Sequence, residues 1–174
     1  AFLAIATLIS ICNGFVFDKL KHDPKILHLL KHHSEFKSKG FGNLQGVPNI
    51  TLCNPPNSKP ELTWLSYSLS PPDIKPGEDI TANASATLST NVTGGNVATS
   101  IKVNGMNIFN DDFDLCEMVP YVGLSCPVAA GAINIYEVYS LPFIPYNGVF
   151  NITVNITDQS NRLITCVNVV TTIT

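Results

Sequence analysis

Phe150-Asn-Ile-Thr-Val-Asn-Ile-Thr157 is the stretch of this chain that decides its fold class. Its apolar and polar residues alternate strictly, which is the pattern of a β-strand with one buried face and one solvated face. Asn151 and Asn155 each begin an Asn-x-Thr sequon on the polar face, where a glycan would leave the core undisturbed. Such triplets also arise by chance, but two in register with the alternation favour a secreted β-protein.

Strands are predicted at regular intervals on both sides of this stretch. The first lies near residue 50, and the others are expected at 62–70, 79–89, 98–103, 106–109, 113–118, 133–138, 149–157 and 163–173. Asn104-Gly105 separates two of them and is a strong signal for a β-hairpin. The pattern contains no convincing helix after residue 50. It therefore predicts an all-β, immunoglobulin-like antiparallel β-sandwich.

The distribution of charge excludes one class of function. The chain has 174 residues, enough for one domain with a good core. Six of its ten Lys and Arg residues lie between Lys19 and Lys39, and from Ile50 onward four basic residues face ten acidic ones. A nucleic-acid-binding protein needs a basic surface to neutralise phosphates. We therefore expect no nucleic-acid partner.

Histidine is confined to the same early segment, between His22 and His33. Residues 50–174 thus lack the imidazole that a Ser/His/Asp or Cys/His hydrolase, or a His-ligated zinc site, requires. His28, His32 and His33 could bind a metal, but no other group with ligand spacing accompanies them. We expect neither a metal site nor a cofactor.

Three segments are expected along the chain. Residues 1–17 are predicted to be a signal peptide whose charged start is missing, with a membrane anchor as the alternative. Residues 18–49 are expected to be a linker or a pro-segment removed during export, and Asp23-Pro24 could begin a short helix in it. Residues 50–174 are expected to form the folded domain.

Four cysteines remain once Cys12 leaves with the signal peptide, and in an oxidising compartment they allow three pairings. Cys116 and Cys126 are close in the sequence and flank a turn-like segment, so we expect them to pair. Cys53 would then pair with Cys166 and connect the first strand to the last. No Cys-x-x-Cys motif supports a metal or redox site instead.

Two apolar loops, at 119–124 and 141–146, are not explained by strand faces. Loops normally lie on the surface, so apolar ones suggest a binding rim or a membrane-contacting edge. The alternative is that they fold back over the ends of the sandwich core. The residue types alone leave both possibilities open.

Motifs along residues 50–174 resemble the ML lipid-recognition family. In chain order they are Cys53, Leu65-x-Tyr-x-Leu-Ser-Pro-Pro72, Lys75-Pro-Gly77, Asp114-Leu-Cys-Glu117, Cys126-Pro127, Leu141-Pro-x-x-Pro-x-x-Gly148 and Leu163-x-Thr-Cys166. The branch they resemble most is the fungal phosphatidylglycerol/phosphatidylinositol transfer proteins, relatives of the Niemann-Pick type C sterol carrier and the ganglioside activator. The order and spacing of the motifs carry this resemblance.

The resemblance implies an eight-stranded sandwich with a lipid cavity between its two sheets. It also implies both disulfides, a trimmed segment before Cys53, and a cavity mouth near the Cys116–Cys126 loop. Sterol carriers of the family usually have a third small disulfide, which this chain lacks, so phospholipid is favoured over sterol.

The residues of the lipid site are expected from strand parity and loop position. The cavity is expected to be lined by Leu65, Tyr67, Phe109, Phe113, Leu115, Tyr136, Val138, Phe150, Ile152 and Val154. Its rim is expected to contain Val119, Tyr121, Val122, Leu124, Phe143 and Ile144. N-glycosylation is expected at Asn49, Asn83, Asn91, Asn151 and Asn155, each of which begins a sequon.

The expected function is that of a monomeric carrier in the secretory pathway, secreted or in a vacuole-like or lysosome-like lumen. It would bind a single phospholipid or sterol molecule and contact membranes transiently, without a catalytic residue. One alternative is an accessory protein that presents lipid to a hydrolase or receptor. Another is a glycosylated structural domain with a filled core. An enzyme is least favoured, because the carboxylates between Asp111 and Glu117 are typical of a solvated turn and strand.

Overall fold

The computed structural model describes residues 44–71, 79–140 and 148–173. Its strands are β1 (Leu44–Leu52), β2 (Leu62–Ser70), β3 (Asp79–Leu88), β4 (Gly95–Val103), β5 (Met106–Asp114), β6 (Gly131–Ser140), β7 (Gly148–Asp158) and β8 (Leu163–Ile173). A short α-helix, α4 (Leu115–Met118), and a 3₁₀ helix, η1 (Val119–Val122), lie between β5 and β6.

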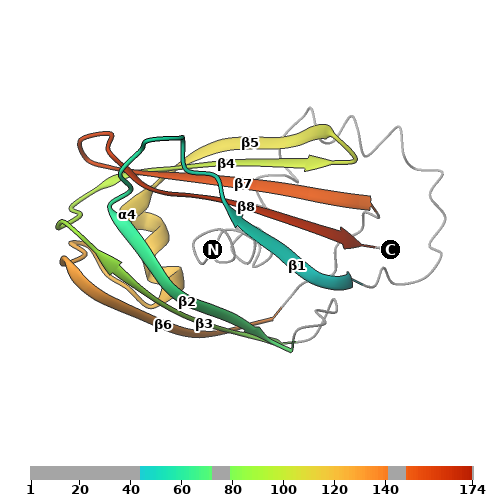
Figure 1. Cartoon of the computed structure of the whole chain (residues 1–174), viewed down its shortest axis with the longest axis horizontal. Coiled ribbons are helices and arrows are strands. Elements are labelled where there is room, and N and C mark those ends of the chain that lie inside the picture. The colour runs from blue at the N-terminus through green and yellow to red at the C-terminus, as the bar shows by residue number, and fades with distance from the viewer. Residues whose placement is uncertain (1–43, 72–78, 141–147, 174) are drawn as a thin grey trace.

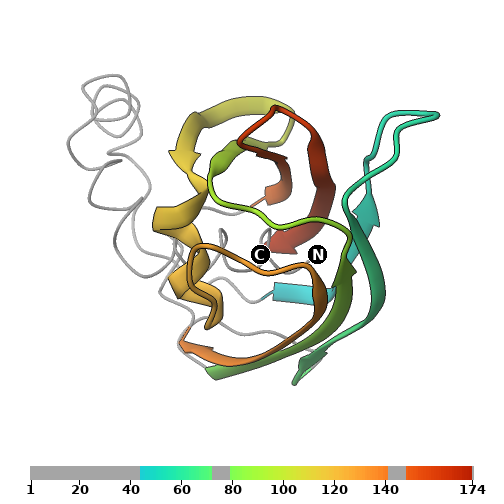
Figure 2. The same cartoon turned by 90° about the vertical axis from the view of Figure 1, so that its left-hand side faces the viewer.

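The strands form two antiparallel sheets that face each other, which confirms the predicted sandwich (Figure 1). The larger sheet has the order β1-β8-β7-β4-β5, and the smaller has the order β2-β3-β6. Viewed from one end of the sandwich, α4 lies on one side of the space between the sheets and the β1 and β2 strands lie on the other (Figure 2).

β7 is the middle strand of the larger sheet and contains the stretch from which the fold was predicted. Its apolar residues Phe150, Ile152, Val154 and Ile156 are all buried. The sheet can bury this row only on one face, because successive side chains of a strand point to opposite faces. Removing each such side chain from water stabilises the fold by about 1.5 to 3 kcal/mol.

The hairpin predicted at Asn104-Gly105 joins β4 to β5. Both turn residues have positive φ angles, 50° and 83°, as a type I′ turn requires. The Asn104 side-chain oxygen also accepts a hydrogen bond from the backbone N–H of Val149 over 2.9 Å. The turn is thereby attached to the start of β7.

Several predicted boundaries differ from the structure. Residues 106–109 and 113–118 were predicted as two strands, but a single strand, β5, runs from Met106 to Asp114, and residues Leu115–Met118 form α4. The carboxylate of Asp114 accepts hydrogen bonds from two backbone N–H groups of the first turn, which favours a helix start over continued strand. In addition, β1 begins at Leu44, and Leu44, Gln45 and Asn49 pair with β8 although a linker or pro-segment was expected there.

Candidate lipid-binding site

An apolar cavity lies between the two sheets, beside α4 and η1. Its volume is about 50 Å³, compared with the roughly 10 to 15 Å³ that one water needs on the same measure. The lining residues are Leu62, Trp64, Ala84, Ser85, Ala86, Leu88, Val92, Leu115, Val119, Leu124, Val128, Ile133, Ile135, Ile156 and Ile164. All except Ser85 are apolar, so the cavity suits a hydrocarbon group.

Small side chains on the central strand of the smaller sheet leave room for this cavity. β3 directs Ala82, Ala84 and Ala86 toward the larger sheet, and all three are buried. Protein interiors are normally filled to the density of organic crystals. The alanine methyl groups are too small to fill the space in front of the central strand of this sheet. Trp64 and Ile133, the cross-strand partners of Ala86, line the cavity and do not fill it.

Trp64 of β2 closes one side of the cavity. Its indole Nε1 donates a hydrogen bond to the hydroxyl of Thr165 on β8, 3.2 Å away, so it joins the two sheets. Further along β2, the hydroxyl of Tyr67 donates to the carbonyl oxygen of Ile50 on β1 at 3.5 Å. These two contacts hold β2 against the larger sheet where no strand pairing does.

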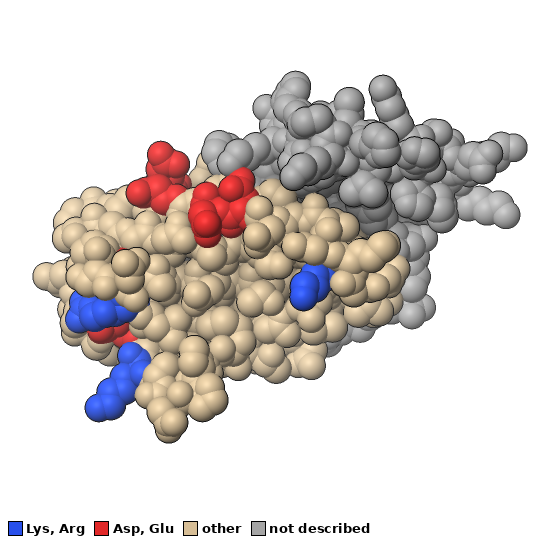
Figure 3. Space-filling model, turned by 90° about the horizontal axis from the view of Figure 1, so that it is seen from above, with Lys and Arg blue, Asp and Glu red and all other residues tan. Residues whose placement is uncertain are grey.

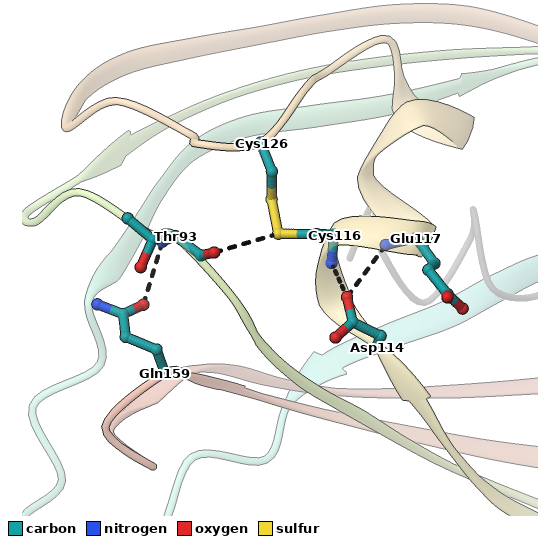
Figure 4. Close-up of a disulfide and its surroundings, with 6 residues drawn as sticks. All are labelled: Thr93, Asp114, Cys116, Glu117, Cys126 and Gln159. Carbon is teal, nitrogen blue, oxygen red and sulfur yellow. Dashed lines mark hydrogen bonds between the residues drawn. A yellow bond between two sulfur atoms is a disulfide. The ribbon is translucent and has the colours of Figure 1, made fainter.

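The Cys116–Cys126 disulfide supports the opposite side of the cavity. The carboxylate of Asp114 accepts hydrogen bonds from the backbone N–H groups of Cys116, at 2.7 Å, and Glu117, at 3.3 Å (Figure 4). These interactions hold the first turn of α4 in place. The helix can then direct Leu115 into the cavity.

A second set of contacts connects this disulfide to the end of the larger sheet. The sulfur of Cys116 lies 3.5 Å from the carbonyl oxygen of Thr93, whose N–H donates to the side chain of Gln159 over 3.1 Å (Figure 4). Gln159 belongs to the turn between β7 and β8. Both predicted disulfides are present, since Cys53 is bonded to Cys166.

An ion-pair network holds the same end of the sandwich together. Arg162 contacts the carboxylate of Asp158 at 2.6 Å and that of Glu61 at 3.1 Å. Burial raises the pKa of Asp158, but hydrogen bonds from the backbone and guanidinium of Arg162 and from Ser160 outweigh it, so the pKa lies below its usual value. The pKa of Glu61 is also lowered, chiefly by the hydrogen bond from the Ser89 hydroxyl.

Two carboxylates occupy inward-facing positions. Asp111 of β5 lies opposite the buried Thr99, and its oxygen accepts a hydrogen bond from the N–H of Asp112. Glu137 of β6 lies opposite the buried Ala82 and is partly buried. The sequence-based prediction missed Glu137, because it expected Tyr136 and Val138, on the opposite face of the strand, to point inward.

Six of the residues predicted to line the cavity are buried between the sheets. They are Phe109, Phe113, Leu115, Phe150, Ile152 and Val154. Of these, Leu115 lines the cavity described above, whereas the other five are core residues of the larger sheet. That these five core residues contact a lipid stays a prediction.

Three of the predicted cavity residues are exposed, and that prediction is wrong for them. Leu65 is the extra residue of a β-bulge between Trp64 and Ser66, which ends the simple alternation along β2. Tyr136 and Val138 lie opposite residues of the outer face of β3 and are 66% and 54% exposed. Tyr67 has the inward parity but is half exposed at the sheet edge.

The predicted rim residues of the 119–124 loop have mixed positions. Val119 and Val122 are buried, and the partly buried Leu124 lines the cavity together with Val119. η1 therefore folds back over the core, and that these residues form the rim of the cavity stays a prediction. Tyr121 is exposed. Phe143 and Ile144 lie outside the described residues.

The sequence-based prediction also missed residues that the structure places around the cavity. Leu62, Trp64, Ala84, Ser85, Ala86, Leu88, Ile133 and Ile135 belong to the smaller sheet, and the other missed residues are Val92, Val128, Ile156 and Ile164. A signal for them was the alternation of three alanines in 79–89, since small residues at core positions leave space.

The predicted sequons lie on solvent-facing positions of the sheets and turns. Asn49, Asn83, Asn91 and Asn155 are exposed, and Asn151 is partly exposed.

The face displayed in Figure 3 carries only scattered charges. Within the described ranges, no cluster of His, Cys, Asp and Glu could hold a metal ion, and no helix has the length and hydropathy to cross a membrane.

Comparison with known proteins identifies the family. The ML domain profile matches residues 49–173. A Dictyostelium discoideum protein named for phosphatidylglycerol/phosphatidylinositol transfer is 37% identical over 101 residues, covering 58% of this chain and 70% of that protein. A Pyricularia oryzae phosphatidylglycerol/phosphatidylinositol transfer protein is 26% identical over 124 residues, covering 71% of this chain and 70% of that protein.

A solved structure has the same fold. The crystal structure of chicken MD-1 complexed with lipid IVa aligns with a TM-score of 0.54 and 17% identity, covering 78% of this chain and 92% of MD-1. The profile match spans most of the chain, and the arrangement of two facing sheets agrees with it. The chain therefore belongs to the ML domain family.

Proposed function

We propose that this chain binds a single lipid molecule by its hydrocarbon part and transfers it between membranes, with phospholipids of the phosphatidylglycerol/phosphatidylinositol type favoured and sterols as the second ligand class. The observation that carries the proposal is the apolar cavity between the sheets. Membership of the ML domain family supports it, as do the transfer activity in the names of its relatives and the lipid bound in the MD-1 structure.

Such a cavity lowers the barrier to moving a lipid through water. Exposing a 16-carbon acyl chain to water would cost roughly 12 kcal/mol, at about 0.8 kcal/mol per methylene. A host lined by Leu, Ile, Val and Ala side chains resembles the bilayer interior, so the lipid can leave the membrane at a much smaller cost. The transfer needs no bond to be made or broken, and we assign no catalytic residue.

The cavity has to widen to hold a whole acyl chain, because its volume of about 50 Å³ admits only a few water-sized groups. The β2 side is the place for this movement. There the smaller sheet contacts β8 and β1 through the side chains of Trp64 and Tyr67 rather than through a ladder of backbone hydrogen bonds. Side-chain contacts can break without disrupting a sheet.

The compartment we propose is the secretory pathway, with the protein secreted or held in a vacuole-like or lysosome-like lumen. Two disulfides fit an oxidising environment. The solvent-facing positions of the five sequons support N-glycosylation there. The signal peptide predicted at residues 1–17 and the pro-segment predicted at 18–49 lie almost wholly outside the described residues.

Transient membrane contact through the exposed ring of Tyr121 is part of the proposal. Tyrosine suits a membrane interface, since its ring is apolar and its hydroxyl is polar. Replacing Tyr121 by Ala should slow transfer between vesicles without changing the amount of lipid bound at equilibrium. We propose a monomer, because a carrier that visits membranes needs only one cavity per chain.

The test uses Trp64, the only tryptophan of the chain. The secreted protein, stripped of lipid, is mixed with vesicles of phosphatidylglycerol that carries brominated acyl chains, and the vesicles are then removed by centrifugation. Bromine quenches indole fluorescence at short range, so a chain in the cavity leaves Trp64 quenched. Vesicles with unbrominated chains are the control.

Quenching that stays with the protein, together with native mass spectrometry showing one bound phospholipid, is the expected result. Protein that retains no lipid from vesicles of phosphatidylglycerol, phosphatidylinositol or sterol would overturn the proposal. A glycosylated structural domain would then be the better description.

A further inference from the structure

We infer that Glu137 contacts the polar end of the bound lipid, and that its carboxylate accepts a hydrogen bond from a ligand hydroxyl. The inference rests on the proposed function and adds the chemical class of the ligand, which is a lipid with a hydroxyl-bearing polar end.

Glu137 continues the inward face of a strand that lines the cavity. Ile133 and Ile135 of β6 line it, and Glu137 is the next residue on the same face, opposite the buried Ala82. Two residues of a strand span about 6.8 Å. A lipid whose hydrocarbon chain packs on the two isoleucines would therefore bring its polar end within reach of the carboxylate.

Within the described residues, the Glu137 carboxylate makes no hydrogen bond and no ion pair. A partly buried carboxylate loses part of its hydration, which costs free energy unless another group replaces the water. Arg162 cannot serve, because it is engaged by Asp158 and Glu61, and Lys102 is exposed on the outer face of β4. Asp111, the other inward carboxylate, accepts a backbone hydrogen bond.

Gly123 leaves space beside this carboxylate. It ends η1 with a φ of 71°, and a Cβ atom at this position would collide with Oε1 of Glu137. Glycine is thus required both by the left-handed backbone conformation and by the close approach. The carboxylate lies beside Gly123, where η1 meets β6, and Leu124, the next residue along the chain, lines the cavity.

The chemistry of the carboxylate determines what it can recognise. An ionised carboxylate only accepts hydrogen bonds, so the ligand must supply a donor. The hydroxyls of a glycerol or inositol head group and the hydroxyl of a sterol are such donors, whereas a phosphate oxygen is repelled. We therefore expect a lipid with a free hydroxyl to bind better than an equally charged lipid without one.

The experiment compares two lipids that differ in this hydroxyl. Lipid-free full-length protein is equilibrated with vesicles containing equal amounts of dioleoyl phosphatidylglycerol and dioleoyl phosphatidylethanol in phosphatidylcholine, and bound lipid is counted by native mass spectrometry. The two lipids have the same chains and net charge. Wild-type protein should carry about tenfold more phosphatidylglycerol, the size expected for one hydrogen bond to a charged group.

Glu137→Gln should reduce this preference several-fold. Glu117→Gln is the matched control, because it removes a carboxylate from the exposed surface of α4. A parallel arm offers cholesterol and its 3-methyl ether, and a Glu137-dependent preference only in that arm identifies the sterol hydroxyl as the donor.

Equal uptake within both lipid pairs by the wild-type protein would overturn the inference, as would a preference that Glu137→Gln leaves intact. The wild-type comparison needs no variant, so it decides the question even if a substitution impairs folding. Protein that takes up no lipid at all would instead refute the proposed function, which makes the two failures distinguishable.

Discussion

The indole nitrogen of Trp64 donates a hydrogen bond to the hydroxyl of Thr165 across the space between the two sheets, over 3.2 Å. Trp64 lines the cavity, and Thr165 is fully buried on the neighbouring sheet. The same side chain thus forms a wall of the candidate site and attaches β2 to the larger sheet.

Replacing Trp64 by Phe should destabilise the fold and loosen this side of the cavity. The buried hydroxyl of Thr165 would lose its partner, which costs about 1 to 3 kcal/mol. Urea unfolding measures this loss. Adding Thr165→Val to the Trp64→Phe variant removes the unpaired hydroxyl and should restore part of the stability. If the loss of stability in the double variant equals the sum of the losses in the two single variants, the hydrogen bond contributes little.

Replacing Ala84 by Leu should block lipid uptake while the protein stays folded. Ala84 is buried at the centre of the smaller sheet and lines the cavity, so a larger side chain would occupy the space left by the alanine row. Lipid uptake from vesicles and circular dichroism measure the two effects. Thr87→Leu, on the exposed face of the same strand, should leave uptake unchanged; equal uptake by both variants would mean that the lipid binds elsewhere.

Removing the two disulfides should have different costs. The loop closed by Cys53–Cys166 spans 113 residues and that closed by Cys116–Cys126 spans 10. In the chain-entropy model these loops contribute about 5 and about 3 kcal/mol. Double alanine variants of each pair, compared in urea, should show the larger loss for the long loop.

The Cys116–Cys126 disulfide should matter more for lipid binding than its small contribution to folding stability suggests, because it holds α4 and η1 beside the cavity. Lipid retention by the Cys116/Cys126 double alanine variant should therefore fall at temperatures where the fold persists. Retention as tight as in the wild type would argue against a positioning role for α4.

Stability should fall in acid because of the ion pairs around Arg162. The pKa values of Asp158 and Glu61 are both lower in the folded state than in the unfolded chain. The stability that these two carboxylates contribute is therefore present above their unfolded-state pKa values and is lost as the pH falls through the lowered folded-state values. Thermal unfolding from pH 7 to pH 3 measures the loss.

Asp158→Asn should flatten this pH dependence and cost about 2 to 3 kcal/mol at neutral pH, since the aspartate accepts hydrogen bonds from two N–H groups and a guanidinium. Asp112→Asn, an exposed carboxylate of β5, is the control and should retain the wild-type profile. An unchanged profile in Asp158→Asn would assign the acid sensitivity to other groups.

Local sequence patterns predicted most of the fold correctly. The alternation from Phe150 to Thr157, the turn at Asn104-Gly105 and the regular spacing of strands depend on neighbouring residues only, so they can be read without the rest of the chain. The pairing of Cys116 with Cys126 is also a near-neighbour property, and it left Cys53 and Cys166 for each other.

Residues around the site were predicted less well, because their positions depend on distant pairing. A bulge at Leu65 changes which residues of β2 point inward after it. β6 has apolar residues on both of its faces, and only its pairing with β3 determines that Ile133 and Ile135 point inward. The start of α4 depends on the capping carboxylate of Asp114.

The sequence by itself therefore determined the class of fold, the two disulfides and the apolar character of the interior, because periodicity and turn chemistry act over a few residues. Only the tertiary structure decided where the cavity lies and which residues line it. A cavity is the space that two sheets fail to fill together, and that depends on side chains such as Ala84 and Ile156 that meet only after the chain has folded.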